Sequence, residues 1–191
     1  MHLKIVGVGH PVLRAVAQPL SRDQLLSSSV QRLIDLMRET MRDAPGVGLA
    51  APQIGEPLQL AVIEVKAEYQ KSLTERELEE RGWKEVPFHV IVNPVLKLLA
   101  DPTETFVEGC LSLPGFSALV PRSPQVRVHC LNHAGESQVI EASGWHARIL
   151  QHEIDHLHGT LYIDRMHSQS FSSIENYNRY GKNRIGQLEQ D

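Results

Sequence analysis

The stretch QHEIDHLHG, residues 151–159, places two histidines four positions apart, with a glutamate directly after the first. Residues four apart lie on the same face of a helix, so His152 and His156 can reach a single metal ion. Glu153 is turned by about 100° around the helix from His152. There it can hold a water molecule beside the ion and move its proton. The pattern HExxH therefore predicts a metal-dependent hydrolase.

The residues around this stretch predict a helix from about Gly144 to His158, with Ser143 as its N-cap. Apolar side chains cover more than half of the helix, and both histidines share a stripe with Trp145 and Ile149. Burying two unpaired imidazoles costs free energy, and a shared metal ion removes that cost. The alternative for HExxH taken alone is a pair of hydrogen-bonded core histidines.

The third ligand is the open question, because two histidines leave a catalytic site of this kind one protein ligand short. The longer pattern HExxHxxGxxH would supply a third histidine, but Tyr162 stands at that position. Glu175, nineteen residues after His156, is one candidate, as in thermolysin-like endopeptidases. Cys110, in the stretch EGCLSLPG (108–115), is the other. The residues alone leave both candidates open.

The rest of the chain predicts an α+β fold, with one catalytic domain over residues 1–191. Helical spacing covers residues 30–41, and segments 58–65, 89–99, 125–132 and 137–143 predict strands. We expect mixed or antiparallel sheets around the central helix that carries HExxH, with Cys130 in the core. The charge-rich segment 66–86 is expected to be a solvated face with a short helix after Thr74.

Composition excludes several classes of protein. The net charge of −4 leaves no basic surplus for phosphate groups, which argues against direct readout of nucleic acid. No apolar run reaches the length of a membrane span, and the start of the chain does not have the pattern of a signal peptide. Two cysteines are too few for a disulfide scaffold and fit a reducing compartment.

Three stretches taken together resemble the three signature motifs of the peptide deformylase family: GVGLAAPQ (46–53), EGCLS (108–112) and QHEIDHL (151–157). The stretches GHPVLR (9–14) and VNP (92–94) match as well. The resemblance implies a metal-dependent hydrolase that removes the N-formyl group from the starting methionine of new polypeptides and releases formate. It implies Cys110, His152 and His156 as the metal ligands, in preference to Glu175.

The same resemblance implies roles for further residues. Glu153 matches the catalytic glutamate, and the Gln53 amide and the Leu111 N–H match the groups that bind the formyl oxygen. Glu108 is expected to pair with Arg122 behind the site. The implied substrate-binding residues are Val47, Gly48, Gly109, Trp145 and Ile149.

The stretch SGWHARI (143–149) resembles the branch that includes organellar and some bacterial members. Trp145 and Arg148 stand where many bacterial members carry aliphatic residues. The resemblance implies one divalent ion, with Fe²⁺ favoured as the native ion over Zn²⁺, Co²⁺ or Ni²⁺. It implies N-formylmethionyl nascent peptides as substrates, met near the ribosome exit. The location would be the cytoplasm of a bacterium, or the matrix of a mitochondrion or plastid. The oligomeric state is left open.

Overall fold

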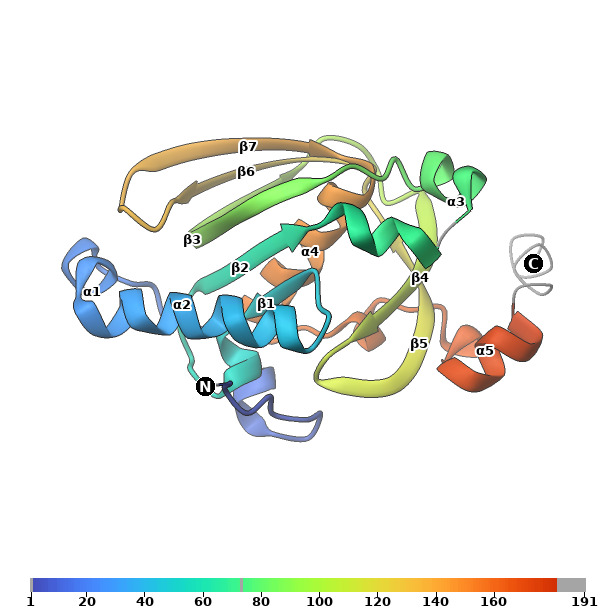
Figure 1. The fold of residues 1–191 in the computed structure, drawn as a ribbon, viewed down its shortest axis with the longest axis horizontal. Helices are drawn as coiled ribbons and strands as arrows, with labels where there is room; N and C mark the ends of the chain where they lie inside the picture. Colours follow the sequence, from blue (N-terminus) through green and yellow to red (C-terminus); the bar gives the residue numbers. More distant parts are fainter. Residues whose placement is uncertain (1, 73, 182–191) are drawn as a thin grey trace.

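Helix α4 (Gly144–Leu157) packs against a five-stranded sheet, and a three-stranded sheet lies on its other side (Figure 1). The computed structural model describes residues 2–72 and 74–181. The larger sheet has the order β1-β2-β3-β6-β7 and the smaller one β4-β5-β8, and all strand pairs in both are antiparallel. The predicted α+β class is confirmed.

The strands and helices have the following bounds. The larger sheet comprises β1 (Gly48–Ala50), β2 (Leu60–Val65), β3 (Val86–Leu98), β6 (Gln125–Leu131) and β7 (Ser137–Ser143). The smaller sheet comprises β4 (Glu104–Cys110), β5 (Leu113–Arg122) and β8 (Ser172–Ser173). The other α-helices are α1 (Arg22–Leu26), α2 (Ser28–Asp43), α3 (Glu75–Glu80) and α5 (Ile174–Tyr180). Short 3₁₀ turns are η1 (Pro11–Arg14), η2 (Ala51–Ile54), η3 (Ala67–Ser72), η4 (Tyr162–Asp164) and η5 (Ser168–Ser170).

Strands β1 and β2 of the larger sheet are covered on both faces, which explains why they are apolar at successive positions. In β2, Ala61 and Ile63 pack toward α4, while Leu60 and Val62 pack toward α2. Helix α2 lies in front of the sheet in Figure 1 and α4 behind it. The predicted helix over residues 30–41 lies within α2, and Cys130 is buried in the α4 core, as expected.

Strand β3 continues through Asn93 and Pro94, within the segment 89–99 that the sequence predicted to be extended. The strand pairs with β2 before this point and mainly with β6 after it, and the register shifts between Val92 and Val95. Asn93 adopts a left-handed conformation, with φ of 49°. Its side-chain amide accepts a hydrogen bond from the Leu20 N–H and donates one to the Leu20 carbonyl, at 2.9 and 2.8 Å. The irregularity thus fastens the N-terminal arm to the sheet.

Helix α4 confirms the predicted start at Gly144 and ends one residue before the predicted His158. The sequence predicted burial of the apolar face of the helix only, but the polar residues Arg148, Gln151 and Asp155 are buried as well. These polar residues face β4, β5 and the segments next to them, where side-chain and backbone partners satisfy them. The helix is therefore enclosed on all sides. Within the described ranges, no helix combines the length and apolar content that crossing a membrane requires.

Two histidines outside the HExxH motif meet where β3 faces the first turn of α4. The rings of His89 and His146 are 5.2 Å apart between centroids and stand edge to face. The Nε2 atoms of both rings are buried and have no hydrogen-bond partner among the described residues. Burial, with repulsion from His89, lowers the pKa of His146 to about 4. Burial also lowers the pKa of His89.

This pair predicts a loss of stability in mild acid. A histidine with a folded pKa of about 4 stabilises the fold fully above its unfolded pKa near 6.5, and that contribution is lost as the pH falls from 6.5 toward 4. In chelator-treated protein, we expect the unfolding free energy of a His146→Phe variant to fall less than that of the wild type between about pH 7 and pH 5. The difference should be roughly 1–2 kcal/mol. Urea unfolding at the two pH values measures it, and parallel losses would contradict it.

Candidate metal centre

The end of β4 and the last two turns of α4 bring a thiol and two imidazoles together. One ligand atom each of Cys110, His152 and His156 lies within 4.8 Å of the other two. Cys110 Sγ is 3.3 Å from His156 Nε2, and the two histidine rings are 5.1 Å apart at an angle of 73°. One thiolate with two imidazoles suits Zn²⁺ and Fe²⁺, and three protein ligands leave a coordination position open. The donor set therefore fits a catalytic divalent ion.

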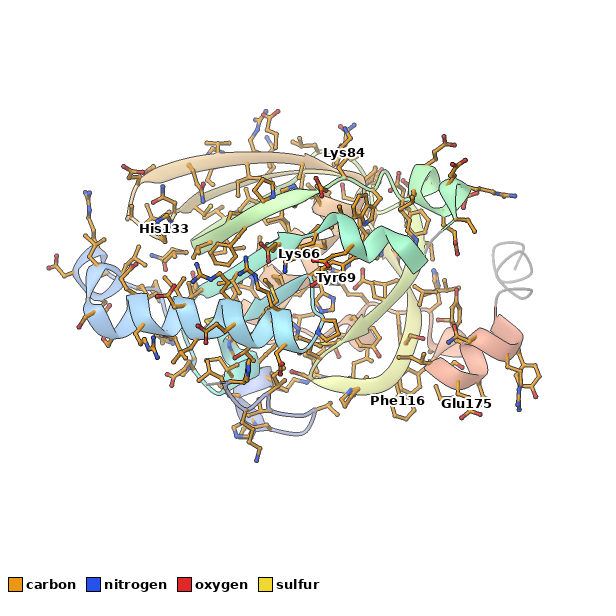
Figure 2. The ribbon with its side chains drawn as sticks, viewed as in Figure 1. Lys66, Tyr69, Lys84, Phe116, His133 and Glu175 are labelled. Atoms are coloured by element: carbon orange, nitrogen blue, oxygen red, sulfur yellow. The ribbon has the colours of Figure 1, made fainter. Side chains whose placement is uncertain are left out.

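The alternative third ligand does not join this group. Glu175 lies in the first turn of α5 and its side chain is exposed (Figure 2). The three-residue cluster found within residues 2–72 and 74–181 does not include it. The ligand set of a thermolysin-like endopeptidase is therefore not assembled by this fold.

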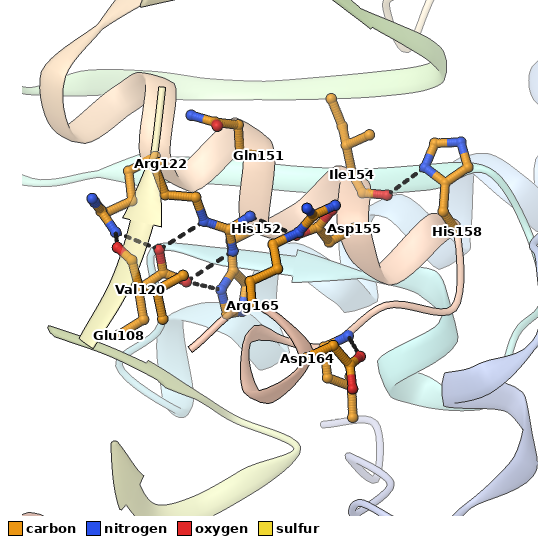
Figure 3. A network of polar contacts seen from close by, with 12 residues as sticks. Glu108, Val120, Arg122, Gln151, His152, Ile154, Asp155, His158, Asp164 and Arg165 are labelled. Carbon is orange, nitrogen blue, oxygen red and sulfur yellow. Dashed lines mark hydrogen bonds and ion pairs between the residues drawn. The ribbon is translucent and has the colours of Figure 1, made fainter. Parts of the chain in front are cut away.

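A buried carboxylate sets the orientation of His152 (Figure 3). Nδ1 of His152 is 2.9 Å from Glu108 Oε2, so that this nitrogen carries the proton and donates it to the carboxylate. Nε2 is then left with its lone pair for a metal ion. Burial alone would lower the pKa of His152, but Cys110 and Glu108 raise it well above its ordinary value. The surroundings of His152 thus favour a positive charge at this point.

Glu108 is itself held by two arginines. Arg122 donates two hydrogen bonds to its carboxylate, at 2.9 and 3.0 Å, and Arg148 donates a third at 2.7 Å. Burial alone would raise the pKa of Glu108, but the hydrogen bonds from His152 and Arg122 hold it well below its usual range. The expected pairing of Glu108 with Arg122 is confirmed, and Arg148 is a second partner that the sequence did not reveal.

The charge network continues to the following turn of α4. Arg122 donates a further hydrogen bond to Asp155 at 2.5 Å, and Arg165 donates two to the same carboxylate at 2.7 and 2.8 Å. Figure 3 shows the chain of contacts from Glu108 through Arg122 to Asp155 and Arg165. Because a buried charge without a partner is costly, every charge placed here needs the others.

Glu153, which follows His152 on α4, packs against Gly48 of β1. Its side chain is buried, and its Oε2 atom has no hydrogen-bond partner among the described residues. Burial raises its pKa to about 7. A Cβ atom on Gly48 would lie 2.2 Å from Glu153 Oε1, so this carboxylate requires a glycine opposite it. The side chain is thus held in position with one oxygen left free for a ligand.

Gln53 brings an amide donor to the same place. Its Oε1 accepts a hydrogen bond from the Ala50 N–H at 2.8 Å, which fixes the direction of the amide group. Its Nε2 is 3.4 Å from both Cys110 Sγ and Ser112 Oγ. The NH₂ group therefore lies directly beside the sulfur of Cys110.

A cavity of about 530 Å³ opens onto these groups. Every residue to which the sequence assigned a catalytic or substrate-binding role lines it: Val47, Gly48, Gln53, Gly109, Leu111, Trp145, Ile149 and Glu153. Arg148, which the sequence placed near the floor of the substrate pocket, also lines the cavity, and the structure adds Arg81, Phe116 and Ile174, which were not assigned to it. No local pattern marks Arg81, which comes from the charge-rich segment expected to be a solvated face. That expectation is wrong at Arg81, because the end of the segment folds back onto α4.

Comparison with known proteins gives a consistent result. A family model described as polypeptide deformylase matches residues 2–172. The chain is 45% identical over 172 residues to the chloroplastic peptide deformylase 1A of Solanum lycopersicum, covering 90% of this chain but 62% of that protein, less than two thirds of its length. It is 44% identical over 167 residues to the mitochondrial peptide deformylase of Homo sapiens, covering 87% of this chain and 69% of that protein.

A solved structure agrees with the sequence relatives. The crystal structure of class I type b peptide deformylase from Acinetobacter baumannii with bound Met-Ala-Ser matches with a TM-score of 0.76 and 31% identity. The match covers 87% of this chain and 99% of the bacterial one.

The ligand assignment predicts the metal content of single variants. A ligand in direct contact with the ion cannot be removed without weakening the site, so Cys110→Ala should lose most of its bound metal. Glu175→Ala and Cys130→Ala should keep it, since one side chain is exposed and the other lies in the core. Metal analysis of the purified proteins measures this. Metal retained in Cys110→Ala but lost in Glu175→Ala would contradict the assignment.

Proposed function

This chain belongs to the polypeptide deformylase family, and we propose that it is a metal-dependent hydrolase that removes the N-formyl group from the formylmethionine at the start of newly made polypeptides. The observation that carries the proposal is the cluster of Cys110, His152 and His156, whose ligand atoms lie within 4.8 Å of one another. Cys110 and His152 line the cavity together with Glu153, whose Oε2 atom has no hydrogen-bond partner among the described residues. A thiol–imidazole cluster alone would suit a structural ion. The free carboxylate and an open cavity are what a hydrolase requires.

Cys110, His152 and His156 are proposed to hold one divalent ion. Such an ion supplies a water molecule of lowered pKa and withdraws electrons from the carbonyl to be attacked. We propose Fe²⁺ as the native ion, replaceable by Zn²⁺, Co²⁺ or Ni²⁺, because a thiolate with two imidazoles is a suitable donor set for all four.

Glu153 is proposed to move the proton. Water adds its oxygen to the formyl carbon and gives one proton to the carboxylate of Glu153. The same carboxyl group then delivers that proton to the amide nitrogen as the carbon–nitrogen bond breaks. The products are formate and a free amino terminus. The unpaired Oε2 supports this role, because no other protein group competes for it within the described residues.

Gln53 is proposed to stabilise the oxygen of the formyl group as it becomes negative. Its NH₂ group is fixed before reaction, since the Ala50 N–H holds the other end of the amide. A donor that is already oriented stabilises charge without the cost of reorganisation. The backbone N–H of Leu111, which also lines the cavity, is proposed as the second donor.

The remaining cavity residues are proposed to bind the peptide. Val47, Trp145 and Ile149 offer apolar surface for the methionine side chain. Gly48 and Gly109 permit close approach of the peptide backbone, and Gly48 is also required by Glu153. We further propose that residues 1–191 act as one catalytic domain on nascent chains near the ribosome exit. The compartment would be the cytoplasm of a bacterium, or the mitochondrial or plastid matrix.

Formate release from formyl-Met-Ala-Ser tests the activity directly, with cleavage of internal peptide bonds followed in the same samples. Metal-loaded protein should release formate and leave the peptide bonds intact. Internal cleavage without formate would point to an endopeptidase. If neither formate nor cleaved peptide forms, the protein would only bind metal or peptide. Internal cleavage without formate and the absence of both products would each overturn the proposed function.

Glu153→Gln tests the proton transfer. Glutamine keeps the size of the side chain but cannot accept the proton, so the metal content should stay near that of the wild type. The loss of general acid–base help should lower kcat by roughly 10²–10⁴, while KM changes little. Glu175→Gln, an exposed glutamate on α5, is the matched control and should retain full activity. Near-normal kcat in metal-loaded Glu153→Gln would mean that a group other than Glu153 transfers the proton.

A further inference from the structure

The charge-rich segment between β2 and β3 ends against the first residue of α4. Gly82 and Gly144 both have positive φ values, of 53° and 59°. A Cβ atom on Gly144 would lie 2.8 Å from the carbonyl oxygens of Arg81 and Gly82. The two segments therefore touch backbone to backbone, which only glycine permits. This contact brings Arg81 to the start of the helix that carries the metal ligands.

The side chain of Arg81 lies over two aromatic rings, one of which, Trp145, lines the cavity. Its guanidinium carbon is 4.9 Å from the centroid of the Trp145 ring and 5.8 Å from that of Phe106. It is half-buried and lines the cavity. A planar guanidinium stacks well on an aromatic face, and this stacking restricts where both side chains can lie.

Arg81 has no ionic role that would account for its position. Arg122 and Arg148 are bound to Glu108 in the interior, and Arg76 on the same segment pairs with Glu80 at 2.6 Å. By contrast, the side chain of Arg81 forms no ion pair or hydrogen bond with any of the described residues. Its contacts are with the aromatic rings and with the cavity itself.

Arg81 lines the cavity beside the first turn of α4, where it lies over Trp145. Trp145 is seven residues before His152 on α4, so the stacked pair lies on the order of 10 Å along the helix from the metal ligands. The apolar residues Val107 and Ile149 also line the cavity. A substrate side chain lying along α4 from the metal cluster toward Trp145 would pass these apolar residues and meet the guanidinium of Arg81.

We propose that Arg81 sets the length of the pocket for the side chain of the formylated residue, and thereby selects methionine against ring-bearing residues. The proposal rests on the proposed function, because it assigns the cavity to that side chain. Arg81 acts here by the space that it fills; its charge is not the selective element. Removing the side chain would open the end of the pocket.

The test compares kcat/KM for formyl-Met-Ala-Ser and formyl-Phe-Ala-Ser in metal-loaded protein. Arg81→Ala should lower the methionine-over-phenylalanine ratio by about tenfold or more, the usual scale for a change of pocket size. Arg81→Met keeps an unbranched side chain without the charge and should stay close to the wild-type ratio. Arg76→Ala, on the same segment but 87% exposed in its side chain, is the control and should leave the ratio unchanged.

A binding measurement separates this inference from the proposed function. The ratio of Kd values for the peptides Met-Ala-Ser and Phe-Ala-Ser does not depend on turnover, and it should shift in Arg81→Ala in the same direction. If the wild type releases no formate, the proposed function fails, and this binding ratio still decides the role of Arg81. An unchanged ratio, or an equal loss for both peptides, would overturn the role of Arg81. A loss of selectivity in Arg81→Met equal to that in Arg81→Ala would assign the selection to charge and also overturn it.

Discussion

The carboxylate of Glu108 is the group on which the rest of the site depends. It lies in the interior, where an isolated negative charge would be strongly unfavourable, and it is held by Arg122, Arg148 and His152. The same contact that satisfies the carboxylate also fixes the proton on His152 Nδ1 and turns Nε2 toward Cys110 and His156. Stability and ligand geometry are therefore provided by one interaction.

This dependence explains why α4 has polar residues on one face although that face is buried. Arg148 and Asp155 are not surface residues of an amphipathic helix; they complete a charge network that begins on β4 and β5. Breaking a buried pair by removing one partner typically costs roughly 3–5 kcal/mol, because the other charge is left uncompensated. The helix that carries HExxH is thus fixed in rotation by ionic contacts on one side and by apolar packing on the larger sheet on the other.

The sequence predicted the parts of the site that short patterns encode. Spacing alone placed His152, Glu153 and His156 on one helix, and the resemblance to a family supplied Cys110, Gln53 and the substrate-binding residues. All of the predicted catalytic and substrate-binding residues line one cavity. Arg81 and the role of Arg148 could not be predicted in this way. A charged residue in a polar segment has the same local pattern whether it faces solvent or folds back onto a helix, and the contact between Gly82 and Gly144 that decides this joins residues 62 positions apart.

The metal affinity of a Glu108→Gln variant tests the central claim most directly. Glutamine keeps the size of the side chain and one acceptor oxygen, but it removes the charge that fixes the tautomer of His152. Competition with a chromophoric chelator for Zn²⁺ should show an affinity about 10–100-fold weaker than that of the wild type, in protein whose far-ultraviolet circular dichroism is unchanged. An unchanged affinity in folded Glu108→Gln protein would show that the ligands orient themselves without the buried carboxylate, and it would contradict this account.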